Sequence, residues 1–525
     1  MTASRKTRPQ SCVMSMGRRA GVSIHLSSLP GEYGIGDIAD SALSFVDRVV
    51  EMGLGVWQFL PLGPTAYGDS PYQPLSAFAG NSNLIGLAPL VKIGLLEGSE
   101  LDGLRELPVD FTDYGRLIPL KRSLLALAAE RFQVRKGNAL QAEYEEFLHR
   151  NADRWLDDYA LFRVLKTAHG ERPWPNWEQE YVRREAAALR KARQAWRDSI
   201  ERTRITQFLF DRQWQALKAY AGERGVCLFG DMPIYIALDS ADAWANREML
   251  LLDRDGRPSH VAGVPPDYFS EDGQLWGNPL YDWAYHEQTG FRWWVERVRH
   301  AAAQTHLVRI DHFRGFESFW SVPFGATTAR EGEWVPGPGD ALFETLEDSL
   351  GLLPIVAEDL GVITPEVDAL RSNHGFPGMV VLQFEVDDPD FEIGAIEENS
   401  VCYTGTHDND TTVGWFRGNG DDTRTPEAIR KTRKRALELT GGTPATIHWD
   451  LISLALSCKS VLAVAPMQDY LGLGSTARLN TPGTTGNNWR WRMRADQLRP
   501  DLVGKIADLV RRTSREPRRS LDSAP

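Results

Sequence analysis

The sequence has few cysteines and no long apolar run. Only Cys12, Cys227, Cys402 and Cys458 occur among 525 residues, and their spacing matches neither a disulfide framework nor a zinc motif. A reducing compartment, the cytoplasm, is therefore expected. No stretch approaches the ~18 apolar residues of a membrane helix, so no membrane association is expected. Residues 1–17 are basic and polar and lack the apolar centre of a secretory signal.

Long blocks of one charge are also missing. The formal net charge is −12, with acidic and basic residues interspersed along the chain. This distribution argues against nucleic acid or an anionic membrane surface as a main partner and leaves neutral substrates open. The sequence is rich in tryptophan, with 17 residues. About half should pack in the core, but aromatic faces also stack against sugars, so the excess mildly favours a carbohydrate ligand.

Two other kinds of site lack the pattern that they need. The segments Gly34–Ala39 and Gly472–Ala477 fit G-x-G-x-x-A, but a long turn separates each from the preceding strand, unlike a dinucleotide-binding junction. A metal-dependent barrel hydrolase would need closely spaced histidine pairs at strand ends, and none occurs. We therefore expect no metal site in the residues that such a hydrolase would use: His25, Asp231, Asp311, His312, His407 and Asp408.

Short apolar segments alternate with helical patterns along most of the chain. Eight such segments begin near residues 21, 56, 226, 306, 354, 378, 400 and 461. Eight buried strands separated by helices predict a (β/α)8 TIM barrel, which typically needs about 250 residues. The excess length predicts large insertions, and no residues remain for a C-terminal β-sandwich.

The expected organisation is one catalytic barrel over residues 18–513. It contains an insertion at about 63–222, helical from about 117, and a loop insertion at about 233–283. A disordered extension is expected at 1–17 and a polar tail at 514–525.

Several of the predicted strands end in carboxylates. Asp231 ends the third, Asp311 the fourth and Glu358 the fifth, and Asp408 follows the seventh. A single carboxylate beside an arginine, such as Asp311 with Arg309, is commonly a structural ion pair. Packing alone does not readily explain several such endings in order along one chain. The carboxyl ends of barrel strands share one face, which carries the active site, so these carboxylates should meet there.

The carboxylates have the properties that glycosidic bond cleavage needs. Retention requires an ionised nucleophile and a protonated acid. Arg309 lies two residues before Asp311 on the same strand face and favours its ionised form, which suits the nucleophile. Glu358 suits the acid, since neighbouring Asp359 and Asp311 would disfavour its charge. Asp408, beside His407, is positioned to steady an oxocarbenium-like transition state.

Three segments together resemble the catalytic motifs of one family. These are Val308–Phe316, Ala357–Gly361 and Tyr403–Trp415, and they resemble the amylomaltases, the 4-α-glucanotransferases or disproportionating enzymes of glycoside hydrolase family 77. The agreement runs from about residue 20 to 492, although 90–222 contributes little to it. Further matching segments are Trp57–Ala79, Asp231–Tyr235, Val261–Trp283, Gln468-Asp469, Asn480–Gly483 and Asn488-Trp489.

The resemblance implies a barrel without a C-terminal β-sandwich, and it implies residue roles. Asp311 would be the nucleophile, Glu358 the general acid/base and Asp408 the transition-state stabiliser. The residues implied to bind substrate are Arg309, His407, Ser70, Tyr72, Asp231 and Asn480, with Tyr268 and Phe269 in a loop over the acceptor side. Gly486–Trp489 has one residue more than the family pattern, and Ser23 departs from its first strand, but neither touches the chemistry.

The implied reaction is disproportionation. An α-1,4 bond of a maltodextrin, starch or glycogen chain is cleaved, and the glucan segment passes to the 4-hydroxyl of another glucan or of glucose. No metal or organic cofactor is implied. Two alternatives remain: an α-1,4-glucan hydrolase using the same residues, and a glucan-binding protein without catalysis, against which the presence of all three carboxylates argues.

Overall fold

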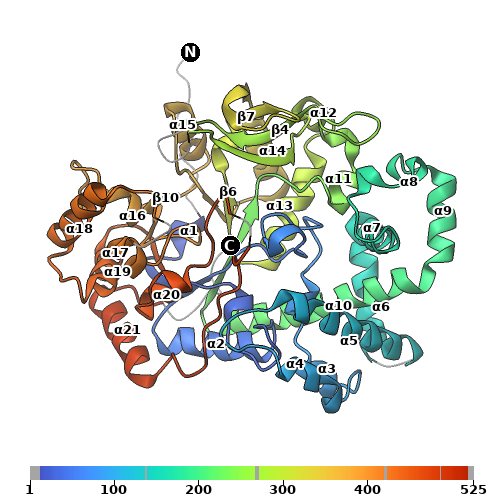
Figure 1. Cartoon of the computed structure of the whole chain (residues 1–525), viewed down its shortest axis with the longest axis horizontal. Coiled ribbons are helices and arrows are strands. Elements are labelled where there is room, and N and C mark those ends of the chain that lie inside the picture. Colours follow the sequence, from blue (N-terminus) through green and yellow to red (C-terminus); the bar gives the residue numbers. More distant parts are fainter. Residues whose placement is uncertain (1–11, 136–138, 267–270, 419–421, 485, 518–525) are drawn as a thin grey trace.

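A ring of parallel strands forms the centre of the molecule. The computed structural model describes residues 12–135, 139–266, 271–418, 422–484 and 486–517. Eight parallel strands pair in the order β10-β11-β12-β1-β2-β3-β6-β9 (Figure 1). The Ala357 N–H donates to the Pro377 carbonyl at 2.9 Å, which links β9 to the start of β10 and closes the ring. The strands are β1 Arg19–Ser23, β2 Val56–Gln58, β3 Cys227–Pro233, β6 Leu307–Asp311, β9 Ile355–Ala357, β10 Gly378–Val381, β11 Ser400–Tyr403 and β12 Leu462–Pro466.

This architecture confirms the predicted (β/α)8 barrel. Each strand begins within about two residues of its predicted start, because a strand buried on both faces gives a short apolar run. Helices connect the strands and pack outside the ring. The connecting helices are α2 Asp40–Glu51, α10 Arg197–Glu223, α13 Arg292–Gln304, α14 Asp340–Leu350, α15 Pro365–Asn373, α16 Leu382–Glu385, α17 Thr412–Arg417, α18 Pro426–Thr440, α19 Ile447–Ser457, α20 Met467–Tyr470 and α21 Pro500–Arg512.

Helices also fill the long insertion between β2 and β3. They lie to the lower and far right of the barrel in Figure 1, and α10 leads back to β3. The helices are α3 Ala88–Lys92, α4 Asp102–Arg105, α5 Tyr114–Val134, α6 Ala139–Asn151, the π-helix η5 Ala152–Leu156, α7 Asp157–Ala168, α8 Gln179–Val182 and α9 Ala186–Ala195. No helix within the described ranges is both long enough and apolar enough to span a membrane.

The N-terminal segment is ordered earlier than expected. Residues Cys12–Ser15 form α1, and the fully buried Val13 packs with side chains that fill the barrel, including Phe229, Tyr403 and Val464. The expectation of a disordered segment up to residue 17 is therefore wrong for residues 12–17. Residues 1–11 lie outside the described part of the chain. The reason is apolar content: Val13 and its neighbours Met14 and Met16 bury surface against the core.

The polar tail was predicted to begin at residue 514, which is too early. Arg515 is fully buried and donates to the Leu456 carbonyl at 2.6 Å, the Cys458 carbonyl at 2.9 Å and the Arg19 carbonyl at 3.2 Å. A charged residue at a chain end predicts exposure, but here the guanidinium donates to carbonyl groups at the end of α19 and on β1.

A second sheet occupies part of the expected loop insertion. Antiparallel strands pair in the order β5-β4-β7-β8 and lie at the top of the view in Figure 1. Two of them lie within 233–283, which was expected to be a loop, together with α11 Ala241–Ala245; α12 Trp283–Gln288 follows. The strands are β4 His260–Val264, β5 Gln274–Pro279, β7 Ser318–Pro323 and β8 Glu333–Pro336. The strands β5 and β8 escaped prediction because they are largely exposed and have no apolar run.

Candidate active site

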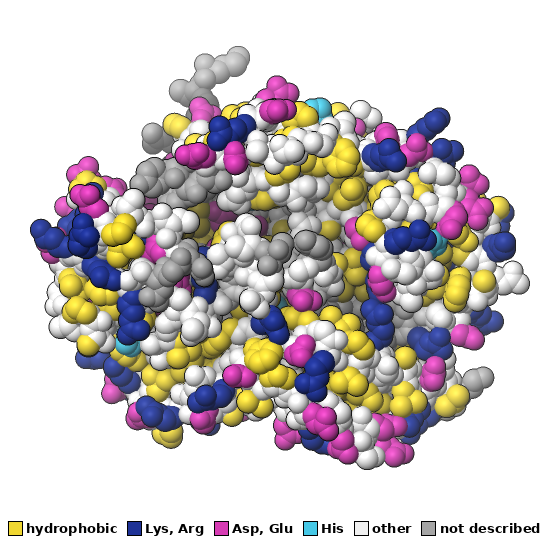
Figure 2. Space-filling model, viewed as in Figure 1, with side chains coloured by type: hydrophobic (Ala, Val, Ile, Leu, Met, Phe, Trp, Pro, Cys, Tyr) yellow, Lys and Arg dark blue, Asp and Glu magenta, His cyan; other side chains and the backbone are white. Residues whose placement is uncertain are grey.

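The strand register brings the carboxylates together at one end of the barrel. On β3 and β6, Asp231 pairs with Arg309, and on β6 and β9, Ile310 pairs with Ala357. Asp311 and Glu358 each follow one of these paired residues, on strands that lie about 4.8 Å apart. Figure 2 shows the molecule hollowed near its centre, with acidic side chains inside the hollow. The predicted meeting of distant carboxylates is thus built by adjacent strands.

Arg309 links two of these carboxylates. Its Nη1 donates to both oxygens of Asp231, at 2.9 and 2.8 Å, and its Nη2 contacts Oδ1 of Asp311 at 2.8 Å. The Asp231 side chain is 1% exposed and that of Asp311 29%. Burial alone would lower the pKa of Arg309, but Asp231 and Asp311 raise it well above its ordinary value. Arg309 therefore stays charged, and Asp311 keeps one carboxylate edge open to the hollow.

Tyr72 links Asp231 to His407 beside Arg309. The Tyr72 hydroxyl donates to Oδ2 of Asp231 at 2.7 Å and lies 3.3 Å from Nδ1 of His407. The two rings stack with centroids 4.9 Å apart. Burial, followed by the charge of Asp231, raises the pKa of Tyr72 well above its ordinary value. The tyrosine therefore remains a hydrogen-bond donor to Asp231.

Asp408 is held from two sides. Nε2 of His407 lies 3.3 Å from Oδ2 of Asp408, and the Asn480 side-chain amide donates to Oδ1 at 2.6 Å. Burial opposes ionisation of Asp408, yet His407 and Asn480 outweigh it and lower its pKa to about 2. Burial would lower the pKa of His407, but Asp408 raises it. Asp408 is therefore ionised at neutral pH, and its charge favours the protonated form of His407.

Glu358 is a carboxyl group whose neutral form is favoured by its surroundings. Burial raises its pKa to about 7, and the charge of Asp311 adds to this effect against the opposing influence of Arg309. The backbone N–H groups of His312 and Leu360 donate to its two oxygens at 2.6 and 2.9 Å and fix its orientation. His312 has a left-handed backbone, φ 55°, which turns the chain directly after Asp311 and brings this N–H to Glu358.

Asp359 does not act on Glu358 as the sequence suggested. It points away from Glu358, accepts from the Met379 N–H at 2.7 Å and lies 3.0 Å from Nε of Arg371. Successive side chains leave a strand in opposite directions, so a neighbour in sequence is not a neighbour in space. The expected contribution of Asp359 to the pKa of Glu358 is therefore wrong, whereas that of Asp311 is present.

The remaining predicted contact residues are Ser70, Tyr268 and Phe269. Ser70 lies two residues before Tyr72, and its Oγ accepts from the Tyr72 N–H at 3.2 Å. Tyr268 and Phe269 lie outside the described residues. Two residues were missed by the sequence analysis. Arg478 donates to the Asp408 carbonyl at 2.6 Å, and the Trp489 ring lies 6.0 Å from that of Tyr72.

The missed residues had only weak signals in the sequence. Arg478 lies two residues before Asn480, which had been recognised. Trp489 lies in the segment Gly486–Trp489, which has one residue more than the family pattern. Within the parts of the chain that are described, no group of three or more His, Cys, Asp or Glu side chains is arranged to hold a metal ion.

Comparison with known proteins agrees with this geometry. The family model described as 4-alpha-glucanotransferase matches residues 24–498. The chain is 46% identical to the 4-alpha-glucanotransferase of Synechocystis sp., covering 93% of this chain and 96% of that protein. It is 45% identical to the 4-alpha-glucanotransferase of Thermus thermophilus, covering 96% and 100%.

Solved structures show the same relationship. The amylomaltase from Streptococcus agalactiae in complex with acarbose superposes with a TM-score of 0.90 at 36% identity, covering 95% of this chain and all of that one. The amylomaltase from Corynebacterium glutamicum, 20% identical with a TM-score of 0.77, shares the fold. The matched family and the relatives leave one conclusion: this chain belongs to the 4-alpha-glucanotransferase family and is a glycosyl-transferring enzyme.

Proposed function

We propose that the enzyme transfers α-1,4-glucan segments by a retaining double displacement at Asp311, Glu358 and Asp408. In the first step, Asp311 attacks the anomeric carbon of a bound maltodextrin. The bond from this carbon to the departing 4-oxygen breaks, and the Glu358 carboxyl proton moves to that oxygen. The donor segment is then held as an ester of Asp311, and the shortened glucan leaves.

In the second step, Glu358 acts as a base. It takes the proton from the 4-hydroxyl of another glucan or of glucose, and that oxygen attacks the anomeric carbon from the side that the first glucan left. The ester bond to Asp311 breaks, and both carboxyl groups return to their starting states. Two inversions give overall retention of the anomeric configuration. One α-1,4 bond replaces another, so the reaction is balanced without a cofactor.

The observation that carries this proposal is the unequal environment of two adjacent carboxyl groups. Asp311 lies 2.8 Å from Nη2 of Arg309 and is 29% exposed, whereas burial raises the pKa of Glu358 to about 7. A carboxylate nucleophile beside a protonated acid is the arrangement that glycosyl transfer needs. Asp408, ionised beside His407, supports the positive charge that develops on the sugar.

The substrate contacts and location belong to the same proposal. We assign Arg309, His407, Tyr72, Asp231, Ser70 and Asn480 to substrate contacts around the cleaved bond, and Tyr268 and Phe269, which lie outside the described residues, to the acceptor side. The glucans are maltose, maltotriose, maltodextrins and the chains of starch or glycogen. A cytoplasmic location is supported by the free thiols of Cys12, Cys227, Cys402 and Cys458.

Incubation with maltotriose tests transfer against hydrolysis. Because the intermediate should meet a sugar hydroxyl rather than water, we expect glucose plus a ladder of glucans longer than maltotriose, with the number of reducing ends constant. Chromatography of the oligosaccharides with a parallel reducing-end assay measures both. Products no longer than maltotriose, with one new reducing end per cleavage, would instead identify an α-glucan hydrolase.

The pH dependence tests the role of Glu358. A pKa of about 7 means that its acid form declines above neutrality, so kcat/KM for maltotriose should fall about tenfold per pH unit well above pH 7. Maltotriose has no group that ionises in this range, and rates from pH 5 to 9 measure the fall. A rate that stays constant up to pH 9 would exclude Glu358 as the acid.

A further inference from the structure

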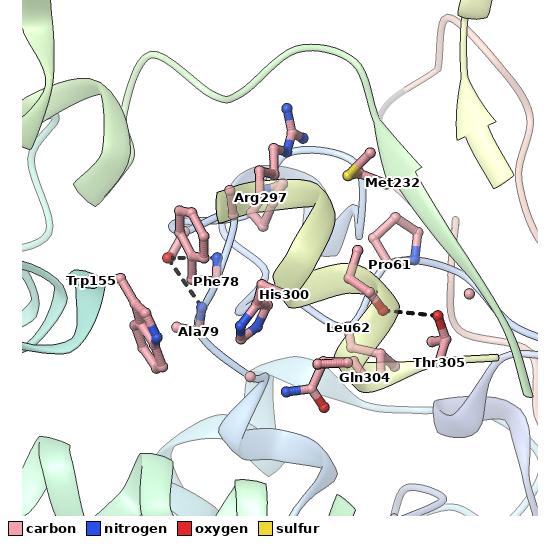
Figure 3. A pocket seen from close by; sticks show the side chains of 18 of the residues that line it. Pro61, Leu62, Phe78, Ala79, Trp155, Met232, Arg297, His300, Gln304 and Thr305 are labelled. Carbon is pink, nitrogen blue, oxygen red and sulfur yellow. Dashed lines mark hydrogen bonds between the residues drawn. The ribbon is translucent and has the colours of Figure 1, made fainter. Parts of the chain in front are cut away.

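A cavity of about 360 Å³ lies outside the barrel ring, apart from the hollow that holds Asp311. Side chains of α10 and the end of β3 line part of the cavity. Its other walls are α13, parts of the loop that follows β2, and the junction of α6 with η5 in the helical insertion. Figure 3 shows side chains from these three elements facing a common space. The volume is within the ~300–1,000 Å³ range of small-molecule sites.

Aromatic rings from separate elements meet in this cavity. Phe78 and Trp155 lie nearly parallel, 13° apart, with centroids separated by 6.5 Å. His300 on α13 presents its ring at steep angles to both, 5.4 Å from Phe78 and 6.0 Å from Trp155 (Figure 3). Trp155 Nε1 donates to Asn151 Oδ1 at 3.1 Å, which fixes the indole. Fixed aromatic faces of this kind bind flat, partly apolar ligands at low entropic cost.

Most charged groups around the rings are paired with one another. Arg154 Nη2 lies 3.3 Å from Oε2 of Glu296, which also pairs with Arg299, and Arg150 Nη2 lies 3.8 Å from Oδ2 of Asp211. A charged ligand would have to disrupt such pairs. A neutral ligand with several hydroxyl groups can instead accept from the guanidinium groups and donate to the carboxylates while the pairs persist.

Two features set this cavity apart from ordinary packing defects. Trp155 lies within the π-helix Ala152–Leu156, and π-helical turns in α-helices are frequent at functional sites. The cavity also touches the end of β3, where Asp231 and Met232 lie, and one wall belongs to the segment that carries Tyr72. It therefore shares a wall with the transfer site, although neither Asp311, Glu358 nor Asp408 lines it.

We infer that this cavity is a second glucan-binding site, which takes a part of an α-1,4-glucan remote from the bond being cleaved. A glucose unit has an apolar C–H face for Trp155 and Phe78, and a hydroxyl edge for the paired arginines and carboxylates. The inference rests on the proposed function, since a polymeric substrate extends beyond the reacting bond. The site raises the affinity for long glucans without contacting the reacting atoms.

Titration of a binding-competent but inactive enzyme tests the inference. In an Asp311→Asn background, calorimetric titration with maltoheptaose should show two binding sites per chain. Adding Trp155→Ala should remove one, since the stacking face is lost. Adding Ala303→Trp should also remove one, because Ala303 lies exposed on α13 at the cavity lining and a bulky ring there fills the space without opening the core. Trp196→Ala, an exposed tryptophan in the same insertion, is the matched control and should leave both.

Kinetics give a second measure. In the otherwise unchanged enzyme, Trp155→Ala and Ala303→Trp should raise KM for amylose about 5-fold more than KM for maltotriose, as expected for the loss of a single stacking contact. A single maltoheptaose site that neither substitution alters would overturn the inference and leave the transferase function standing. Loss of a site in Trp155→Ala alone, with Ala303→Trp unaffected, would overturn it too. An enzyme that neither binds maltoheptaose nor makes the maltotriose ladder would refute the proposed function itself.

Discussion

Asp311→Asn should lower kcat/KM for maltotriose disproportionation by about 10⁴-fold or more. Asparagine has nearly the same shape, but its amide is a poor nucleophile, so the ester with the glucan cannot form. Arg309 retains its contacts with Asp231, at 2.8 and 2.9 Å, and the site should remain assembled. Because the loss is chemical, the dissociation constant for maltotriose should change by less than about threefold. Glucose release and equilibrium binding measure the two quantities.

The matched control for Asp311 is Asp501→Asn. Asp501 lies on α21 with its side chain 71% exposed, away from the barrel mouth, so its substitution should leave both quantities unchanged. Full disproportionation by Asp311→Asn would remove Asp311 from the nucleophile role. A large loss of binding together with activity would instead assign Asp311 to substrate binding.

The meeting of the carboxylates at the barrel mouth could be predicted from the sequence because the strands of a barrel are short and run in one direction. Once eight strands are recognised, each carboxylate at a strand end must face one rim. The contact of Arg309 with Asp311 follows from the two-residue spacing along a strand, and the structure has it at 2.8 Å. The contact between Arg309 and Asp231 could not be predicted from spacing along one strand, because it depends on the register between β3 and β6.

What escaped prediction depends on contacts between segments distant in sequence. Arg478 reaches the Asp408 carbonyl across 70 positions, and no local pattern identifies that partner. Val13 was assigned to a disordered extension and Arg515 to a polar tail because their neighbours are polar, although both are fully buried. Their burial reflects the spaces that the barrel leaves at its base, a property of the packed fold and not of local composition.

The dominant cause of the pKa of Glu358 also needed the structure. From sequence, two neighbouring carboxylates were expected to raise it, yet burial is the larger cause and Asp359 pairs with Arg371 instead. Burial of a single side chain at a rim cannot be judged from a motif, because it depends on the loops that surround it. The sequence therefore predicted Glu358 as the acid for a physical reason that was only partly correct.

Glu358→Gln separates acid catalysis from nucleophilic attack. Glutamine cannot protonate the departing oxygen, so maltotriose disproportionation should fall about 10³-fold, within the range for loss of a general acid. With α-maltosyl fluoride as the donor, fluoride leaves without a proton, and the first step should be retained within about tenfold. Fluoride release at early times measures that step. Glu344→Gln on α14, an exposed glutamate, is the matched control and should behave as the unsubstituted enzyme.

The second step of the same variant gives the decisive result. Without a base at position 358, the acceptor hydroxyl cannot be activated, so the maltosyl ester should accumulate and appear as a mass increase on the peptide that contains Asp311. Azide needs no base, and adding it should restore turnover and yield α-maltosyl azide, the anomer expected after two inversions. Formation of the β-azide, or an adduct on a peptide without Asp311, would contradict the double displacement. Equal losses with maltotriose and with the fluoride would show that Glu358 acts in binding and not as the acid.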